Sequence, residues 1–282
     1  MRKIGRVLFC ILPLLLSLGI QFLVSIPVLF YYAIFKINTA PEQMNFVSIL
    51  NNLMDSILHA DFSVIVVIFW AILSSLVFAY WYNKKRDHSK SIPFKKMLTP
   101  LAILGIVFLS FGFQIFINYL YSGIELIHPE WFRTFNALMK SSTGGSTLTV
   151  IIFFIYSVIG APIHEELIFR GVTLHYAEKA LPFWAANILQ ALLFGIMHMN
   201  IIQGTYAFLA GLFLGYIYHR TKSIWGSIIF HIIFNFLGSI IQFQDISNTL
   251  SKNIAVSTIG ILIIFMGMVL YETGMKNRRL QE

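Results

Sequence analysis

Ionisable and amide side chains interrupt three otherwise apolar stretches of this sequence. A carboxylate can act as a general base, an imidazole can hold or transfer a proton, and an amide can donate a hydrogen bond to a developing negative charge. A charged side chain near the centre of a bilayer costs about 2.5–3.5 kcal/mol on insertion scales, so such residues in an apolar span are candidates for function. The candidates are Glu165, Glu166, Arg170, His198, His231 and Asn235.

Glu166 and Arg170 are four residues apart with the acid first, which is the favourable order for an ion pair along one helix face. Such a pair neutralises itself and allows both side chains to remain in a low-dielectric place. Glu165 lies about 100° away around the same helix and has no partner at helical spacing. Its charge is therefore free for chemistry. Pro162, just ahead of the glutamates, is expected to kink the helix.

His231 and Asn235 are also four residues apart, so both project from one face of their helix. Phe194 and His198 repeat this spacing in an earlier apolar run. Counting about 1.5 Å per residue from the cytosolic edge of each helix places these polar side chains and Glu165 roughly 12–24 Å deep in a core about 30 Å thick. We therefore expect them to converge near the middle of the membrane.

The composition is that of a polytopic membrane protein. Of the 282 residues, 57% are hydrophobic and 11% are charged, whereas soluble domains carry about 25% charged residues. The single cysteine, Cys10, excludes an intramolecular disulfide and a cysteine-based metal site. We predict an all-α, polytopic membrane helix bundle. Its transmembrane helices, about eight in number, are predicted at 7–35, 62–82, 98–121, 147–174, 182–200, 203–219, 223–243 and 254–272.

The distribution of basic residues predicts the orientation of the bundle. With both termini in the cytosol, 16 of the 20 Lys and Arg residues lie on the cytosolic side and 4 lie outside, in agreement with the positive-inside rule. Because the basic residues flank apolar segments, the formal net charge of +8 reflects topology, and we predict a lipid bilayer environment and no nucleic-acid partner.

Three motifs, in this order, resemble the CPBP family, which comprises type II CAAX prenyl endopeptidases and bacterial Abi and bacteriocin-immunity-like membrane proteins. EELIFRG (165–171) is similar to the family pattern EExxxR, FGIMH (194–198) to FxxxH, and HIIFN (231–235) to HxxxN/D. The resemblance covers roughly 160–240, and 1–145 contains no motif of the family. One such motif alone is weak, whereas three in order with plausible gaps are specific.

The resemblance implies an intramembrane endopeptidase, a hydrolase that cleaves a membrane-associated peptide or protein. If the residues of these motifs have the roles that they have in the family, Glu165 would be the general base for the attacking water, and His198 would hold that water. His231 and Asn235 would stabilise the oxyanion of the tetrahedral intermediate. The supporting residues would be Glu166, Arg170 and Phe194.

The sequence leaves the use of a metal open. His164 and Glu165 do not form an HExxH motif, because Ile168 occupies the position of the second histidine. Glu165, His198 and His231 could still form a three-ligand zinc site with an open position, and the family has been called metalloproteases. We expect no metal and no cofactor, because an amide beside one imidazole suits an oxyanion pair better than a zinc site.

Two other functions are compatible with the same residues. One is a non-catalytic bacteriocin-immunity or scaffold protein that binds a peptide partner through the polar cavity. The other is a small proton-coupled transporter in which Glu165 and the histidines relay protons, which is disfavoured because the sequence has no inverted repeat. In each case we predict a multi-pass protein of a bacterial plasma membrane.

The chain is predicted to be one membrane domain over residues 1–282. Its parts are N-terminal helices without motifs (1–146), the CPBP-like catalytic core (147–243), and the last helix with a basic tail (244–282).

Smaller features complete the sequence prediction. An interfacial helix is expected over 44–58 and a flexible turn at 141–147. The spacing of Ala207, Gly211 and Gly215 predicts a close helix-packing face and not a ligand loop. Three histidines that lie beside the motifs or at helix ends are predicted to be interfacial, namely His164, His175 and His219.

Overall fold

The computed structural model describes residues 3–39, 60–85, 92–97, 99–143, 145–241 and 249–279, together with positions 47, 50, 51, 54 and 55. These residues form helices and no strand, which confirms the all-α prediction. In chain order the elements are α1 (Lys3–Phe9), α2 (Leu12–Thr39), α4 (Ala60–Lys85), α5 (Phe94–Met97), α6 (Pro100–Ile127), α7 (Pro129–Thr143), α8 (Thr147–Ile155), η3 (Tyr156–Gly160), α9 (Ala161–Glu166), η4 (Leu167–Leu174), α10 (His175–Ala177), α11 (Phe183–Met197), α12 (Ile201–Thr221), α13 (Ile224–Ile240) and α14 (Leu250–Arg279).

Six helices in the described part of the chain are long and apolar enough to cross a membrane. They cover Gly5–Ile34, Ala60–Lys85, Pro100–Ile127, Thr147–Ala177, Ile201–Thr221 and Leu250–Lys276. The helices α11 and α13 are shorter, with 15 and 17 residues, or about 22 and 26 Å at 1.5 Å per residue. The hydrocarbon core is about 30 Å thick. Each predicted span therefore coincides with a helix, and the number that cross the membrane stays a prediction.

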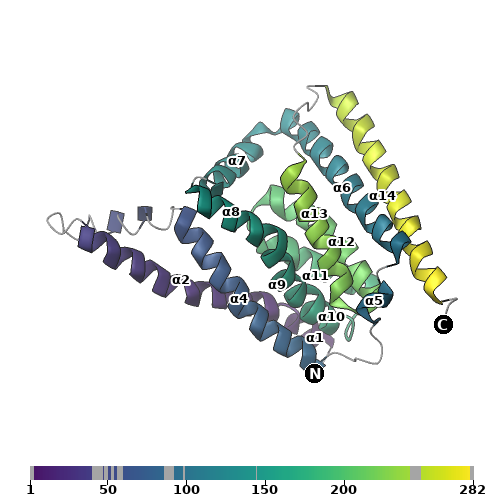
Figure 1. Cartoon of the computed structure of the whole chain (residues 1–282), viewed down its shortest axis with the longest axis horizontal. Helices are drawn as coiled ribbons and strands as arrows, with labels where there is room; N and C mark the ends of the chain where they lie inside the picture. The colour runs from purple at the N-terminus through teal and green to yellow at the C-terminus, as the bar shows by residue number, and fades with distance from the viewer. Residues whose placement is uncertain are drawn as a thin grey trace.

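The bundle is built around the fourth predicted span, which runs without interruption from α8 to α10 (Figure 1). The helix α12 packs against both α11 and α13, all three contact this span, and α4 also contacts it. On the flanks of the bundle, α2 packs against α4 and α14 pairs with α6. The three motif-bearing helices therefore meet inside the bundle.

Glycines allow α6 and α14 to approach closely. Gly260, Gly267 and Gly274 recur every seven residues along α14. A Cβ on Gly267 would lie 2.6 Å from the backbone nitrogen of Leu109 and 2.9 Å from the carbonyl oxygen of Gly105. Because lipid tails are as apolar as the side chains, membrane helices associate through such close backbone packing. The seven-residue glycine period is the sequence signal for this pair.

The glycines of α12 confirm the predicted packing face. A Cβ on Gly211 would lie 3.1 Å from the Cβ of Ala191 in α11. One on Gly215 would overlap the side-chain oxygen of Asn187. The face that Gly211 and Gly215 share with Ala207 is thus occupied by α11, which excludes a ligand loop there.

Most of the described basic residues lie at one end of the bundle, which we call the basic end. It is the end at which α4, α12 and α14 finish and α1 begins (Figure 1). Its basic residues are Arg6, Lys84, Lys85, Lys179, Arg220, Lys222 and Lys276. The helix α7 lies at the opposite end, which we call the α7 end. The charge asymmetry that the sequence predicts therefore separates two ends of one bundle, and the cytosolic placement of the basic end stays a prediction.

The sequence prediction missed α7. A flexible turn is predicted at 141–147, but α7 continues to Thr143, and the side chain of Ser146 caps α8. Phe132 of α7 is buried, and the helix contacts α4, α6, α8 and α12 across the α7 end. The interfacial helix predicted over 44–58 lies almost entirely outside the described residues.

Candidate active site

Two wide turns flank the glutamates of the fourth predicted span. The backbone hydrogen bonding is α-helical in α8, π-helical in η3, α-helical again in α9 and π-helical again in η4. Glu165 and Glu166 are the last two residues of α9, and Arg170 lies in η4. Such π-helical turns are rare and occur frequently at functional sites. Each one rotates the residues that follow it, so the two turns decide which way the glutamates and the arginine face.

Pro162 leaves a carbonyl group of the first wide turn without a backbone donor. The N–H of Ala161 bonds the carbonyl oxygen of Tyr156, five residues back, so the next N–H in this pattern would bond Ser157. Pro162 has no N–H. Instead, Asn235 of α13 donates its side-chain Nδ2 to the Ser157 oxygen at 2.8 Å. Asn235 thus replaces the missing backbone donor and ties α13 to η3.

A buried charge cluster joins α9, η4 and α13. Glu166 and Arg170 are both 0% exposed, and Nη1 of Arg170 donates to Oε1 of Glu166 at 2.8 Å, as their spacing predicts. Nη2 of Arg170 donates to the carbonyl oxygen of Gly211 at 3.2 Å, and its guanidinium carbon lies 4.6 Å from the centre of the Phe194 ring. The same Oε1 of Glu166 lies 2.9 Å from Nδ1 of His231. Because an ionised carboxylate only accepts hydrogen bonds, this contact assigns a ring proton to Nδ1.

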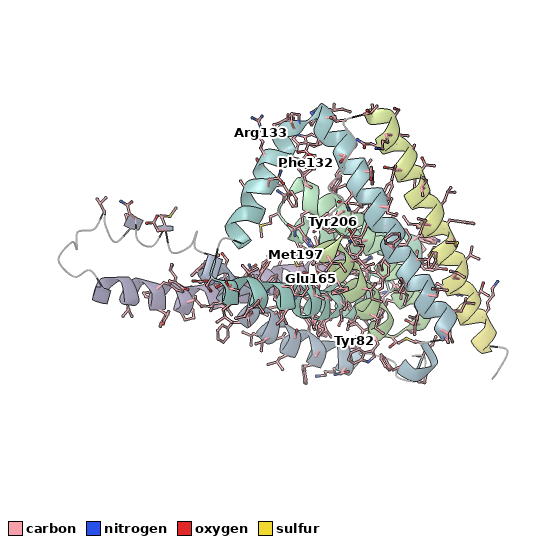
Figure 2. All side chains as sticks on the ribbon, turned by 45° about the horizontal axis from the view of Figure 1, so that its top comes forward. Tyr82, Phe132, Arg133, Glu165, Met197 and Tyr206 are labelled. Atoms are coloured by element: carbon pink, nitrogen blue, oxygen red, sulfur yellow. The ribbon has the colours of Figure 1, made fainter. Side chains whose placement is uncertain are left out.

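Glu165 faces the other ring nitrogen of His231. Its Oε2 lies 3.7 Å from Nε2 of His231, inside the bundle (Figure 2). Glu165 is 7% exposed, whereas Glu166 is fully enclosed. If both glutamates are ionised, they carry two negative charges and Arg170 carries one positive charge. A second ring proton on His231 would neutralise the remaining negative charge. His231 therefore contacts both the free and the ion-paired glutamate.

Phe194 orients the two histidines of the motifs. Its ring meets His198 edge-on with 5.0 Å between ring centres, and His231 edge-on with 5.9 Å. His198 caps the end of α11, where its Nδ1 lies 2.9 Å from the carbonyl oxygen of Phe194. Met199 follows in the left-handed region with φ of 50°, and the side chain of Asn200 caps the first turn of α12. This tight turn fixes where α11 ends and therefore where His198 stands.

The structure thus joins six of the seven predicted site residues through contacts. Glu165 and Glu166 meet at His231, which touches Phe194, and Phe194 in turn contacts the remaining histidine and arginine. The seventh residue, Asn235, lies on α13 with His231, and its side chain bonds the backbone of η3. Their catalytic roles stay predictions.

Whether a metal binds at the three candidate ligands stays a prediction. Glu165, His198 and His231 have the donor types of a zinc site, and their contacts at Nδ1 leave Nε2 of each ring open, as metal-binding histidines require. In the part of the chain that the structure describes, however, no group of three or more His, Cys, Asp or Glu side chains could hold a metal ion. No step proposed below is routed through a metal.

The prediction that His164 is interfacial is wrong. It is 0% exposed, and its ring centre lies 4.7 Å from that of Trp70 in α4 and 6.3 Å from that of Tyr156. Its Nδ1 contacts the carbonyl oxygen of Gly160 at 3.3 Å. The aromatic ring of α4 that covers His164 comes from a distant part of the sequence, so no local pattern could have revealed it.

A buried polar cluster beside the guanidinium was also missed. Gln190 donates Nε2 to the carbonyl oxygen of Gly211 at 2.9 Å and to Oδ1 of Asn187 at 2.7 Å. Asn187 donates to the carbonyl oxygen of Leu212 at 2.9 Å. The Gly211 oxygen therefore accepts from both Gln190 and Arg170, which fixes the guanidinium from the side of α12. The signal in the sequence is the spacing of two amides three residues apart on α11.

Comparison with known proteins gives two matches. Residues 147–237 match the family model described as type II CAAX prenyl endopeptidase Rce1-like. The Bacillus subtilis protein named "Putative membrane peptidase YdiL" is 30% identical over 103 residues, which cover 36% of this chain and 42% of that relative. The alignment therefore spans less than half the length of the relative. Neither description mentions a metal or bacteriocin immunity, so neither supports a metalloprotease or an immunity protein. No solved structure matches the chain.

Proposed function

We propose that this membrane protein is an intramembrane endopeptidase of the CPBP family, which hydrolyses a peptide bond of a membrane-associated peptide or protein. The match of residues 147–237 to the type II CAAX prenyl endopeptidase model and the similarity to a Bacillus subtilis membrane peptidase support this proposal. The observation that supports this most directly is the position of His231 between Glu166 and Glu165. One glutamate is held by a guanidinium and enclosed, and the other faces the second ring nitrogen of the same histidine. Groups that are this costly to bury in a membrane mark function. The membrane is proposed to be a bacterial plasma membrane.

Glu165 would act as the general base. The water oxygen adds to the carbonyl carbon of the scissile bond while one of its protons passes to the Glu165 carboxylate. The same proton then goes to the leaving amine nitrogen as the C–N bond breaks. His198 would hold the water, because its Nδ1 is engaged by the carbonyl group of Phe194 and its Nε2 is free to accept a hydrogen bond.

His231 and Asn235 would stabilise the oxyanion. The Nδ1 of His231 already donates to Glu166, so His231 serves the oxyanion through Nε2 in its protonated form. The Nδ2 of Asn235 carries two hydrogens, of which one is used on Ser157 and one is available. Donors in a dry site, aimed where negative charge develops, contribute about 3–4 kcal/mol each.

A pair of adjacent glutamate variants tests this assignment. Wild type, Glu165→Gln and Glu166→Gln are purified in detergent and incubated with a defined set of synthetic peptides, and the products are measured by mass spectrometry. Glu165→Gln should accumulate normally and cleave nothing, because an amide cannot take a proton from water. Glu166→Gln should mainly lose thermal stability, because Arg170 remains buried without its counter-charge.

Two results would contradict the proposal. Wild-type turnover in a folded Glu165→Gln variant would exclude Glu165 as the base. Unchanged stability with a selective loss of turnover in Glu166→Gln would show that the two glutamates have exchanged roles.

A further inference from the structure

The protein is closed on the side of Glu165 that faces the basic end. The polar residues of this region are fully buried, although they come from four different elements. They are Glu166, Arg170, Thr173, Gln190 and Ser227, each 0% exposed. The apolar residues around them are equally enclosed, namely Phe169, Leu174, Leu214, Ile217 and Phe230, each at most 1% exposed. The region between Glu165 and the basic end is therefore closely packed.

On the side of Glu165 that faces the α7 end, the polar side chains are only half-buried. These residues are Ser157 on η3, His198 at the end of α11, Tyr206 on α12 and Asn235 on α13. Each of the four is fewer residues from the α7 end of its helix than Glu165 is from the α7 end of the fourth predicted span. The four elements thus present hydrogen-bonding groups along one direction that ends at the free carboxylate.

Ser157 lies on the same face of its helix as Glu165. In this part of the span, Tyr156 stacks on His164, with 26° between the ring planes, so residues eight positions apart share a face. Ser157 and Glu165 are likewise eight positions apart. Asn235, which binds the Ser157 carbonyl, lies across from them on α13. Ser157 therefore stands between the α7 end and the general base.

Figure 2 places Glu165 between the two ends of the bundle. From the α7 end inward its labels pass from Arg133 and Phe132 on α7, through Tyr206 and Met197, to Glu165. Tyr82, at the basic end of α4, lies beyond Glu165. The candidate active site is therefore placed between a packed region and the end that α7 covers.

The charge asymmetry assigns these two ends to the two sides of the membrane. Basic residues concentrate on the cytosolic side of membrane proteins. The basic end holds Arg6, Lys84, Lys85, Lys179, Arg220, Lys222 and Lys276, and the α7 end holds Arg133 and Lys252 among the described basic residues whose side chains are placed. The half-buried polar side chains therefore lead from the non-cytosolic side of the membrane to Glu165.

We propose that the substrate is presented from the non-cytosolic side, as a secreted peptide or a segment of a translocated protein, and not as a C-terminal tail in the cytosol. This proposal rests on the proposed function, since it names the substrate class of the same site. Its physical basis is that the protein is closely packed between Glu165 and the basic end, whereas the polar side chains between Glu165 and the α7 end are half-buried. A cytosolic tail would have to pass the buried Arg170 cluster to reach the base.

Thiol accessibility tests the direction of access, and the chain suits this experiment because it contains one cysteine. Cys10→Ser removes that buried thiol. Single cysteines are then introduced as Ser157→Cys and, as a matched control, Ser227→Cys. Both serines donate to the carbonyl oxygen three residues back, at 2.9 and 3.0 Å, but Ser227 lies on the sealed side. A charged, membrane-impermeant maleimide is added to intact cells and to inverted membrane vesicles.

Ser157→Cys should react with the maleimide in intact cells and lose this labelling in inverted vesicles. Ser227→Cys should react in neither preparation and should react fully after denaturation, which shows that it is present. Two exposed positions report the orientation independently: Met199→Cys (76% exposed) should label in intact cells, and Lys84→Cys should label only in inverted vesicles.

Several outcomes would overturn the proposal. Labelling of Ser157→Cys only from the cytosolic side, or of Ser227→Cys in native inverted vesicles, would show cytosolic access. No labelling of Ser157→Cys in either preparation would show that no aqueous route leads to the site from the α7 end. Because the readout needs no turnover, an inactive protein with the expected labelling would refute the protease proposal while leaving the direction of access intact.

Discussion

Removing the side chain of Asn235 should lower both stability and turnover, for two separate reasons. The carbonyl group of Ser157 would lose its donor, because Pro162 offers no N–H in its place. An unsatisfied buried polar group costs about 1–3 kcal/mol. The oxyanion would also lose a donor, which lowers kcat by about 10²–10³-fold. KM should change little, because that interaction forms mainly in the transition state.

Pro162→Ala should repair only the first of these losses. Alanine restores a backbone N–H that can bond the carbonyl group of Ser157. We therefore expect the double variant Pro162→Ala/Asn235→Ala to unfold at nearly the same midpoint as Pro162→Ala alone, while kcat stays about 10²–10³-fold low. Thermal unfolding in detergent and initial rates on a cleaved peptide give the two quantities, and a double-mutant cycle gives the coupling between the sites.

Asn118→Ala provides a matched control. Asn118 is also half-buried, and its Nδ2 donates at 2.8 Å to a carbonyl oxygen of its own helix, that of Gln114. Pro162→Ala should not relieve the effect of this variant. The reasoning about the free carbonyl group is wrong if Asn235→Ala has the same unfolding midpoint as wild type. It is also wrong if Pro162→Ala restores the midpoint of Asn235→Ala no more than it restores that of Asn118→Ala. If kcat also recovers in the double variant, Asn235 acts only through the backbone and the oxyanion role is refuted.

Three further predictions concern the charge cluster, the helix packing and the metal. Arg170→Leu leaves a buried glutamate without its counter-charge and should destabilise the protein by about 3–5 kcal/mol. Arg220→Leu should cost much less, because the carboxylate partner of Arg220 is 24% exposed. Equal decreases in the unfolding midpoint of the two variants would contradict this prediction. Gly267→Ala should separate α14 from α6 and cost about 1–3 kcal/mol, while Gly19→Ala, with open space around the new Cβ, should be close to neutral in the same unfolding assay. Treatment with a chelator should leave peptide cleavage unchanged; stoichiometric zinc in the purified wild type that is lost in His231→Ala would overturn the metal-free proposal.

The sequence alone predicted the features that depend on spacing along one helix. Glu166 and Arg170 form their ion pair because residues four apart share a helix face whatever surrounds them. The apolar spans and the bias of basic residues likewise follow from local composition, so the helical bundle and its charged end were predictable. The motifs also indicated which three helices carry the site. The helix α7 was missed, because its charged residues Glu130, Arg133 and Lys140 keep it from standing out as an apolar span.

Only the tertiary structure decided what each remaining polar group contacts. His231 reaches Glu166 across 65 positions of the sequence, and Asn235 reaches Ser157 across 78. Spacing gives the angle between side chains within one helix, but the relative rotation and depth of two helices are set by the side chains packed between them. In this protein the wide turns of η3 and η4 add a further rotation to the fourth predicted span. The pattern of apolar residues does not reveal these turns. The direction of the Glu165 side chain therefore follows only from the tertiary structure, in which α13 and α11 pack against the fourth predicted span.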